Sequence, residues 1–459
     1  MFFERELYPQ LISWAQKSRH ALYLEGPRQV GKTELLKKLG KEHFDICVYI
    51  DVRIDGDKFE SLMDYHMEKF GRSTFPEEMG EVWEGVLREF APEYINSNRT
   101  LVILDEIQES PKIHNEIRYL RRGLKSKLAV SGSYLGITTQ SKEYWHAAGD
   151  LVHAELASLS FREFLKANGA WDKYDKIITF DLARMTDAEQ EICEQVRELY
   201  RIYCQIGGYP DVVQEWVISR DVESCKQVVV EILRLLYKES SNYFGEVIGT
   251  TLWASTLGRV TEDIVSKSGD LDTKIAKEFF RSEDSQGLSI RRKDKVNALK
   301  WLMDCGIIGM VLVYSEMNST CTLGNKFQFY LRDMGILTRL VVLSTNIPDS
   351  NVAGMMAENF TFMQLRNMLE KEFIGANVHT FNGAWGQIDF IMHNRDRRRF
   401  GIEVKHGSGN TKSGDKALAD GKIDFLIRVQ DTYGSIDEKQ ATIPIFMLDK
   451  LKYIVVPNE

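Results

Sequence analysis

The segment GPRQVGKT, at residues 26–33, constrains the fold of this chain more than any other feature. It follows a short apolar run, ALYLE, and precedes TELLKKLG, which has the apolar spacing of a helix. A glycine-rich turn in this context, with the spacing Gly-x-x-x-x-Gly-Lys-Thr, is typical of a phosphate-binding loop, in which backbone N–H groups surround the phosphates of a nucleotide. We therefore expect ATP to bind the loop residues, which are Gly26, Pro27, Arg28, Gln29, Val30, Gly31, Lys32 and Thr33.

Two loop side chains and two later carboxylates form the predicted chemistry of this site. We expect Lys32 to reach the β- and γ-phosphates and the Thr33 hydroxyl to hold Mg²⁺. The run LVILDE ends in Asp105 and Glu106. A buried strand that ends in two acids supplies a Mg²⁺ ligand, Asp105, and a catalytic base for the attacking water, Glu106.

The order of apolar runs predicts the fold around this loop. Five runs rich in β-branched residues alternate with helix-length segments, at residues 21–26, 46–52, 101–106, 127–133 and 151–159. This alternation is typical of a parallel sheet with crossover helices, so we expect an α/β domain over residues 1–160. The fourth run ends in Ser131 and Ser133, which either sense the γ-phosphate or are ordinary turn residues.

The rest of the chain divides by pattern into three further regions. Residues 161–260 have long helical periodicity, broken at IGGYP, and predict a helical lid. Residues 261–345 read as a helix followed by a short strand pair, in the order of a winged helix-turn-helix. Its helix begins with Arg291, Arg292, Lys293 and Lys295, which either contact DNA phosphates or are solvated. Residues 346–459 predict a small α/β module.

Composition restricts the class of protein. The chain has 459 residues, 43% of them hydrophobic, and no apolar run of about 20 residues, so we expect a cytoplasmic protein without a membrane contact. Its six cysteines show no paired spacing, which favours neither a zinc site nor disulfides. The net charge of −8 argues against a basic surface throughout, so any nucleic-acid contact must be local.

A second candidate site lies in WGQIDFIMHNRDRRRFGIEVKH, at residues 385–406. Asp389 lies in one apolar run, and Glu403 and Lys405 lie in the next. If the two strands pair so that the acids are adjacent, both carboxylates hold Mg²⁺ at the tip of a hairpin while Lys405 activates water. Glu358, on the preceding helix, would complete the pocket. The alternative is a set of solvated residues on an exposed sheet, including the arginine run between the strands.

The motifs together resemble a known family. GPRQVGKT, LVILDEIQ, LAVSGSYLG, LSFREFL and IGGYPDVV, followed by KFQFYLRDMGIL and ENFTFMQL, resemble AAA-type P-loop ATPases that carry a conserved C-terminal domain of unknown function. The resemblance implies a RecA-like core of the additional-strand class, a winged helix and a restriction-endonuclease-like module similar to PD-(D/E)XK nucleases. It assigns Lys32, Thr33, Asp105 and Glu106 to the ATP site. To the nuclease-like pattern it assigns Glu358, Asp389, Glu403 and Lys405.

One position departs from that family. Where the family usually has an arginine, this chain has Asp150, so the contribution of that arginine to the ATP site is missing. The sequence leaves Arg162 and the cluster Arg118, Arg121 and Arg122 as candidates to stabilise the charge that develops on the γ-phosphate.

Two functions follow. In the first, ATP hydrolysis gates a Mg²⁺-dependent nuclease that acts on DNA, in defence or DNA processing. In the second, the ATPase is a nucleotide-driven switch whose nuclease-like domain is inactive and binds a protein partner, or further copies of the chain. The intact set of two acids and a lysine favours the first.

Overall fold

We analysed a computed structural model of the chain, which describes residues 2–132, 149–244, 301–314, 327–343, 349–372, 379–383, 386–394, 398–405 and 412–455. The chain forms two compact units. The N-terminal unit comprises Met1–Ser158 and Lys300–Gly306, and the C-terminal unit comprises Leu159–Leu299 and Ile307–Glu459. No helix among the described residues is long and apolar enough to cross a membrane.

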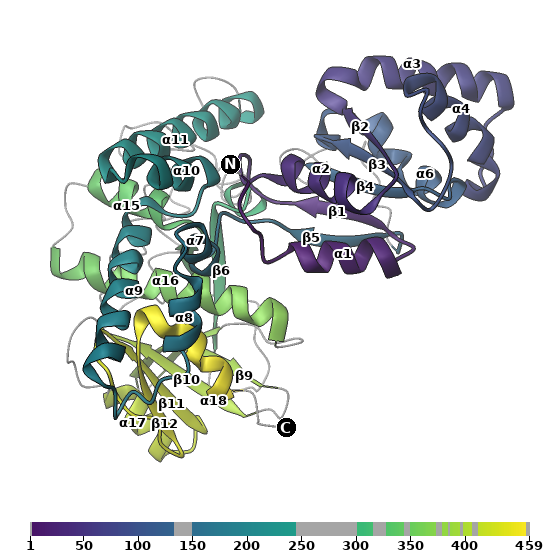
Figure 1. Cartoon of the computed structure of the whole chain (residues 1–459). Coiled ribbons are helices and arrows are strands. Elements are labelled where there is room, and N and C mark those ends of the chain that lie inside the picture. The colour runs from purple at the N-terminus through teal and green to yellow at the C-terminus, as the bar shows by residue number, and fades with distance from the viewer. Residues whose placement is uncertain are drawn as a thin grey trace, which may run out of the picture. The chain divides into compact units, whose positions relative to one another are not determined.

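The N-terminal unit contains a five-stranded sheet in the order β2-β3-β4-β1-β5 (Figure 1). All neighbouring strands are parallel. The strands are β1 (Ala21–Glu25), β2 (Ile46–Asp51), β3 (Thr100–Asp105), β4 (Lys127–Gly132) and β5 (Leu151–Glu155). The five predicted strands and the parallel sheet are therefore confirmed. Strand β4 lies between β1 and β3, as expected for the additional-strand class.

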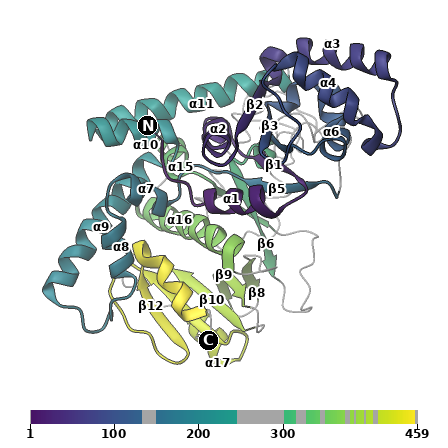
Figure 2. The ribbon, with the colours of Figure 1, turned by 45° about the vertical axis from the view of Figure 1, so that its right-hand side comes forward.

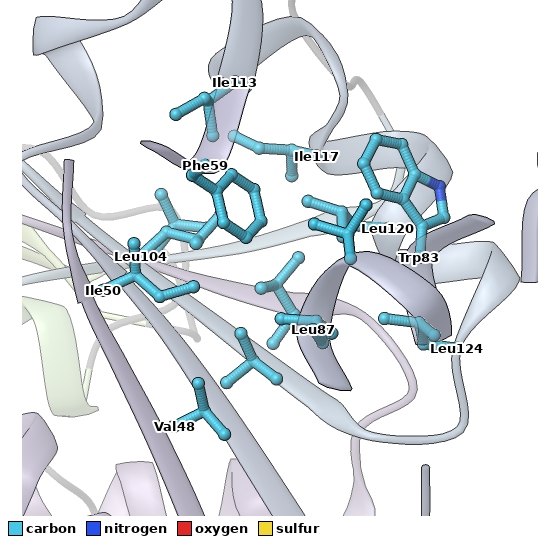
Figure 3. Close-up of a cluster of buried hydrophobic side chains, with 14 of the residues drawn as sticks. Val48, Ile50, Phe59, Trp83, Leu87, Leu104, Ile113, Ile117, Leu120 and Leu124 are labelled. Carbon is cyan, nitrogen blue, oxygen red and sulfur yellow. The ribbon is translucent and has the colours of Figure 1, made fainter. Parts of the chain in front are cut away.

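Helix α1 (Tyr8–Lys17) precedes β1, and the strands are connected by α2 (Lys32–His43), α3 (Val52–Phe70), α4 (Gly80–Phe90), α5 (Pro111–Asn115) and α6 (Ile117–Gly123). Side chains of α3 to α6 pack against β2 and β3 in one buried cluster, which includes Phe59, Trp83 and Leu120 (Figure 3). Val48 and Ile50 of β2 alternate with residues that point to the other face of the sheet, so both enter this cluster. Burying a large apolar side chain contributes about 1.5–3 kcal/mol, so this core fixes the strand ends that carry the ATP motifs.

The C-terminal unit begins with helices α7 (Phe161–Ala167), α8 (Trp171–Ile177), α9 (Asp187–Ile206), α10 (Pro210–Ser219) and α11 (Val222–Phe244). A capping box formed by Thr186 and Glu189 starts α9, and Gly207, with a φ of 76°, ends it. Pro210 then opens α10. The predicted helical region and its break at IGGYP are confirmed as far as residue 244.

A seven-stranded sheet follows, in the order β12-β11-β10-β9-β8-β6-β7. Its strands are β6 (Ile308–Tyr314), β7 (Phe327–Leu331), β8 (His379–Gly383), β9 (Gly386–His393), β10 (Arg399–Val404), β11 (Phe425–Gln430) and β12 (Gln440–Pro444). The remaining elements are α15 (Met334–Leu343), α16 (Asp349–Glu372), α17 (Lys412–Ala419), the 3-10 helix η3 (Ile445–Lys450) and α18 (Leu451–Val455). Helix α16 packs on β7 and β10, whereas α17 packs on β9 to β11. Figure 2 shows α16 beside β10.

This sheet crosses the boundary that the sequence predicts at residues 345/346. Strand β6 pairs antiparallel with β7 and parallel with β8, so the predicted wing strands and the C-terminal strands share one sheet. Sequence periodicity cannot reveal a pairing between strands so far apart in the chain. The start of the helix predicted in this region, with Arg291, Arg292, Lys293 and Lys295, lies outside the described residues.

The helices of residues 161–244 are joined to this sheet by buried polar contacts, so the segment predicted as a lid belongs to the C-terminal unit. Asp333, at the start of α15, accepts the backbone N–H of Gly208 at 2.9 Å. A Cβ at Gly208 would lie 2.0 Å from the Leu159 carbonyl oxygen, so only glycine fits this junction. The strings LSFREFL, IGGYPDVV and KFQFYLRDMGIL therefore meet at one structural junction.

Candidate functional site

The loop between β1 and α2 adopts backbone conformations that its glycines permit. Gly26 has a φ of 146°, and a Cβ there would lie 2.0 Å from the Leu156 carbonyl oxygen. Gly31 has a φ of 92° and directly precedes Lys32, the first residue of α2. Gln29 also has a positive φ, of 61°. The loop thus turns sharply at the carboxyl edge of the sheet, where its N–H groups precede a helix N-terminus, as a phosphate site requires.

Lys32 is held within this loop. Its side chain is buried, and Nζ donates hydrogen bonds to the carbonyl oxygens of Gly26, at 2.9 Å, and Pro27, at 2.7 Å. The ammonium is therefore held inside the loop, next to the space in which we expect the phosphates of a nucleotide. Phosphate oxygens would replace acceptors that the loop itself supplies.

Asp105 is the centre of a buried hydrogen-bond network and is 2% exposed. The Thr33 hydroxyl donates to its Oδ2 at 2.6 Å, and the Tyr49 hydroxyl donates to the same oxygen at 2.9 Å. The Ser131 hydroxyl donates to Oδ1. The structure thus brings together the two predicted Mg²⁺ ligands, Thr33 and Asp105, and the oxygen donors fit that cation. Ser133 lies outside the described residues.

Glu106 has a left-handed backbone, with a φ of 53°, which is uncommon for a residue other than glycine. The Gln108 side-chain amide donates a hydrogen bond to its carboxylate. Such strained conformations are concentrated at functional sites. Glu106 follows β3 directly, so its carboxylate emerges from the same sheet edge as the phosphate loop.

Sequence reasoning missed Tyr49 and Gln108. Tyr49 lies near the carboxyl end of β2, the parallel neighbour of β3, with Tyr49 opposite Ile103 in the ladder. Burial raises the pKa of the Tyr49 phenol, and the Asp105 carboxylate acts in the same direction. A polar residue at the end of the strand beside LVILDE was a usable signal, but only after the strand order was known.

The arginine candidates do not converge on this site. Arg122 Nε donates a hydrogen bond to Asp150 Oδ1 at 2.9 Å. Arg118 Nε forms an ion pair with Asp150 Oδ2 at 3.5 Å. Asp150 directly precedes β5, whereas the phosphate loop follows β1, and the two strands are parallel. The arginine cluster therefore lies at the amino edge of the sheet, about 16 Å from the carboxyl edge at about 3.3 Å per residue. Arg118 and Arg122, two of the candidates for the γ-phosphate, are instead paired with Asp150 at the opposite edge of this sheet.

Arg162 is also engaged elsewhere. Its guanidinium forms a two-pronged pair with the buried carboxylate of Asp449, with Nη2 2.7 Å from Oδ1. The Tyr174 hydroxyl donates to the same carboxylate at 2.8 Å. This pair joins α7 to η3 within the C-terminal unit, so we assign Arg162 a structural role.

The second candidate site is formed where β9 and β10 separate. Their antiparallel ladder runs from Arg399 opposite His393 to Ile402 opposite Phe390. Continuing this register places Glu403 opposite Asp389. The ladder stops there because Asp389 Oδ2 accepts the backbone N–H of Val404, at 2.8 Å, in place of a backbone carbonyl. The predicted juxtaposition of the two acids is therefore present. It lies at the end of the strand pair away from the turn, not at the hairpin tip.

Glu403 is a buried acid with an unused oxygen. It is 2% exposed, and its Oε1 has no hydrogen-bond partner among the described residues. Burial raises the pKa of Glu403, the Lys405 ammonium opposes this shift, and the Asp389 carboxylate adds to it. The nearby backbone N–H of Gly414 also opposes the rise in pKa. An unpartnered carboxylate oxygen beside a second carboxylate and an ammonium fits a divalent cation held through oxygen.

Glu358, the third predicted acid of this site, is bonded to side chains of β7. It accepts hydrogen bonds from the Tyr330 hydroxyl, at 2.6 Å, and from the Gln328 side-chain amide, at 3.2 Å. No group of three or more His, Cys, Asp or Glu side chains in the described part of the chain is placed to hold a metal ion. Its carboxylate is thus held by residues of β7. Burial raises the pKa of Tyr330, and the nearby Asp389 carboxylate adds to the shift. That Glu358 completes the metal pocket stays a prediction. Sequence spacing could not show these bonds, because β7 and α16 are separate in the chain.

Lys405 borders a cavity of about 410 Å³ that is formed mainly by α9, α15 and α16. Apolar side chains such as Val341 and Met356 line much of it, and Asp431 adds a charge. Lys405 thus lies between the Asp389–Glu403 pair and an apolar space.

The comparisons agree with the fold of the N-terminal unit. Residues 18–165 match a family described as an AAA domain. This part of the chain is similar to AAA-type P-loop ATPases. Residues 197–347 match a domain of unknown function. No curated protein matches the chain.

Several solved structures also resemble the chain. They include a Walker-type ATPase of Pyrococcus abyssi, with 15% identity, coverage of 74% of this chain and 96% of that one, and a TM-score of 0.41. The Orc1 protein of Aeropyrum pernix in complex with DNA has 14% identity, coverage of 80% and 95%, and a TM-score of 0.26. The RuvB Holliday junction branch migration motor of Thermotoga maritima has 12% identity, coverage of 67% and 90%, and a TM-score of 0.25.

The Tyr49 hydroxyl gives a first testable prediction. We expect Tyr49→Phe to raise the Mg²⁺ concentration needed for half-maximal ATP turnover by roughly 10-fold, because one hydrogen bond to a charged group contributes about 1.5 kcal/mol. Nucleotide affinity in EDTA should stay at the wild-type value. The measurement is ATP turnover across a Mg²⁺ titration. A lowered maximal rate with an unchanged Mg²⁺ dependence would show that the hydroxyl does not position Asp105.

The buried acid of β10 gives a second prediction. Because the folded-state pKa of Glu403 is raised, its protonated form favours folding, and this stabilisation is lost as pH rises above the usual carboxyl range. In EDTA, Glu403→Gln should therefore melt above wild type at neutral pH, and the difference should vanish near pH 4. The slope is at most about 1.4 kcal/mol per pH unit. Glu438→Gln, at an exposed acid, is the control. Equal curves for both variants would contradict the burial argument.

Proposed function

We propose that this chain binds and hydrolyses ATP with Mg²⁺ at the phosphate loop, and that ATP turnover controls Mg²⁺-dependent cleavage of DNA at the Asp389–Glu403 pair. The single observation that carries the first part is the direct contact between Thr33 and Asp105 beside the buried Lys32. A hydroxyl, a carboxylate and an ammonium meet there at the carboxyl edge of a parallel sheet, which is where ligands bind in such folds. The similarity to AAA-type P-loop ATPases supports the same assignment.

Each residue has a distinct role in this proposal. Lys32 and the loop N–H groups bind the β- and γ-phosphates. Thr33 and Asp105 hold Mg²⁺, which neutralises charge on the phosphates when bound. Glu106 accepts a proton from the attacking water, and its hydrogen bond from Gln108 orients its carboxylate.

The proposed cleavage site uses the second set of residues. Asp389 and Glu403 would hold Mg²⁺, which stabilises charge on a phosphodiester when bound. Lys405 orients water or stabilises the negative charge that develops on the phosphate. The support is the separation of β9 from β10 at these two acids and the unpartnered Glu403 Oε1. Structural acids buried at a strand junction usually have hydrogen-bond partners, which Glu403 Oε1 lacks among the described residues.

A nucleotide-driven switch is the second candidate. Two observations favour it: the described residues contain no three-ligand metal group, and Lys405 borders an apolar cavity. In that case the C-terminal unit binds a protein partner and the acid pair has no catalytic role. ATP binding and hydrolysis are common to both candidates.

One experiment separates them. Purified protein is incubated with single-stranded, linear and supercoiled DNA, with Mg²⁺ or Mn²⁺, and with or without ATP, while ATP hydrolysis is followed in parallel. Metal-dependent cleavage that responds to ATP supports the nuclease. ATP hydrolysis without cleavage of any DNA form, and without a shift in melting temperature caused by metal, supports the switch.

A further inference from the structure

We propose that the amino edge of the N-terminal sheet, opposite the phosphate loop, binds the phosphate backbone of a nucleic acid. The surface, which we call the basic edge, consists of Arg19, Arg118, Arg121, Arg122, Lys125 and Lys127. This site lies in the ATPase domain itself and is separate from both sites described above. It does not depend on whether the Asp389–Glu403 pair is a nuclease.

The topology brings these residues together. All strands of the sheet are parallel, so their amino ends share one edge, and β4, β1 and β5 are consecutive in the sheet order. Lys127 is the first residue of β4, Arg19 lies just before β1, and Asp150 lies just before β5. Helix α6 ends shortly before β4 and carries the three remaining arginines (Figure 1).

Electrostatic contacts confirm that the cations are neighbours. Arg118 and Arg122 both pair with Asp150. Burial lowers the pKa of Arg121, the Asp150 carboxylate opposes this shift, and the nearby Arg19 adds to it. Burial likewise lowers the pKa of Lys127, with the Arg121 guanidinium adding to the effect. Like charges are therefore held together at this edge. Their mutual repulsion disfavours the charged forms of Arg121 and Lys127, and a bound anion would relieve it.

The charges at the basic edge are not balanced. Within the part of the chain that the structure describes, two carboxylates pair with its six cations: the buried Asp150, and Glu77, which lies 3.6 Å from Arg122. The side chains of Arg118 and Arg122 are 52% and 37% exposed, and Arg19 and Lys125 are exposed as well. In a chain with a net charge of −8, this is a local excess of accessible positive charge that composition does not predict.

The geometry of the cations favours phosphates as the ligand. Arg118, Arg121 and Arg122 have the i, i+3, i+4 spacing that places side chains on one face of α6. Planar guanidinium groups bind phosphate oxygens in pairs. Strands lie about 4.8 Å apart, so the row from β4 to β5 is about 10 Å long, which is the length of about three phosphates along one strand. A row of cations without a defined pocket recognises a backbone and not a base sequence.

The position of the basic edge has a functional consequence. The phosphate loop follows β1 and the basic edge precedes β1 and β4, so the two ligands would occupy opposite ends of the same strands. ATP and nucleic acid would then bind without competing for space.

The test uses the full chain in EDTA, which prevents cleavage, with a fluorescently labelled oligodeoxynucleotide and anisotropy as the readout. Affinity is measured across salt from about 50 to 200 mM. Arg19→Glu with Lys125→Glu changes two exposed residues and leaves Asp150 and its partners intact. We expect at least about tenfold weaker binding and a salt slope lowered by about two, because two phosphate contacts are lost. ATP turnover without DNA should stay at the wild-type rate, which also shows that the variant folds.

The matched control is Lys58→Glu with Lys69→Glu, which makes the same charge change at exposed positions of α3 in the same unit. Equal loss of affinity in both double variants would mean that only net charge matters and would overturn the proposal. Wild-type affinity and slope in the Arg19/Lys125 variant would also overturn it. Displacement of the oligonucleotide by polyglutamate of equal charge would assign the basic edge to an acidic protein instead. Failure of ATP hydrolysis would refute the proposed function and leave this binding result unaffected.

Discussion

A Glu106→Gln variant is expected to bind ATP with the wild-type affinity and to turn it over about 10²- to 10⁴-fold more slowly. The substitution keeps the size of the side chain and leaves Thr33, Asp105 and Lys32 in place, so the nucleotide contacts persist. It removes only the group that accepts a proton from the attacking water. Binding is measured with a fluorescent ATP analogue, and turnover is measured by release of inorganic phosphate.

A Lys32→Ala variant is compared with Glu106→Gln, because it should lose ATP binding and not only turnover. Its ammonium is the cation held inside the phosphate loop by the Gly26 and Pro27 carbonyl oxygens, so its loss should weaken ATP binding itself. The two variants should therefore separate affinity from turnover. Unchanged turnover in Glu106→Gln would exclude Glu106 as the base, and tight ATP binding by Lys32→Ala would contradict the role of the loop.

Asp389→Ala and Glu403→Ala are each expected to abolish metal-dependent DNA cleavage while ATP hydrolysis stays at the wild-type rate. The two carboxylates lie opposite each other where β9 and β10 separate, and neither alone supplies enough oxygen ligands for Mg²⁺. Lys405→Ala should slow cleavage by about 10²- to 10³-fold, as does the loss of one electrostatic donor, and should keep the metal-dependent rise in melting temperature. Cleavage is measured on supercoiled DNA, and melting is measured in EDTA and in Mg²⁺.

Glu358→Ala distinguishes a structural acid from a catalytic one. Its carboxylate accepts bonds from Tyr330 and Gln328, so its removal leaves two buried donors unpaired and should destabilise the C-terminal unit by about 1–3 kcal/mol. Glu358→Gln, which keeps one acceptor oxygen, should restore most of that loss. Full loss of cleavage in Glu358→Gln with an unchanged melting temperature would show that Glu358 acts in the active site. Wild-type cleavage in Asp389→Ala would exclude the acid pair as the site.

Much of the ATPase site could be predicted from the sequence because its parts are local. A strand, a glycine turn and a helix follow one another within residues 21–43, and backbone preferences together with apolar spacing specify such an arrangement without reference to the rest of the chain. The same holds for Asp105 and Glu106 at the end of a buried strand. Their convergence with the loop follows from one further rule, that the carboxyl ends of parallel strands share an edge.

The sequence by itself thus determined which segments form strands and helices, and which side chains stand at strand ends. Tertiary structure decided which of those side chains meet. Tyr49 and Ser131 reach Asp105 because β2 and β4 flank β3. Arg118 and Arg122 pair with Asp150 because β5 starts at the opposite edge of the sheet. Glu358 bonds to β7, and β6 joins β8, across long stretches of chain. Such pairings depend on the packing of distant segments. A hydrophobic pattern that repeats every two to four residues indicates a strand or a helix, but it does not indicate which distant segment packs against it.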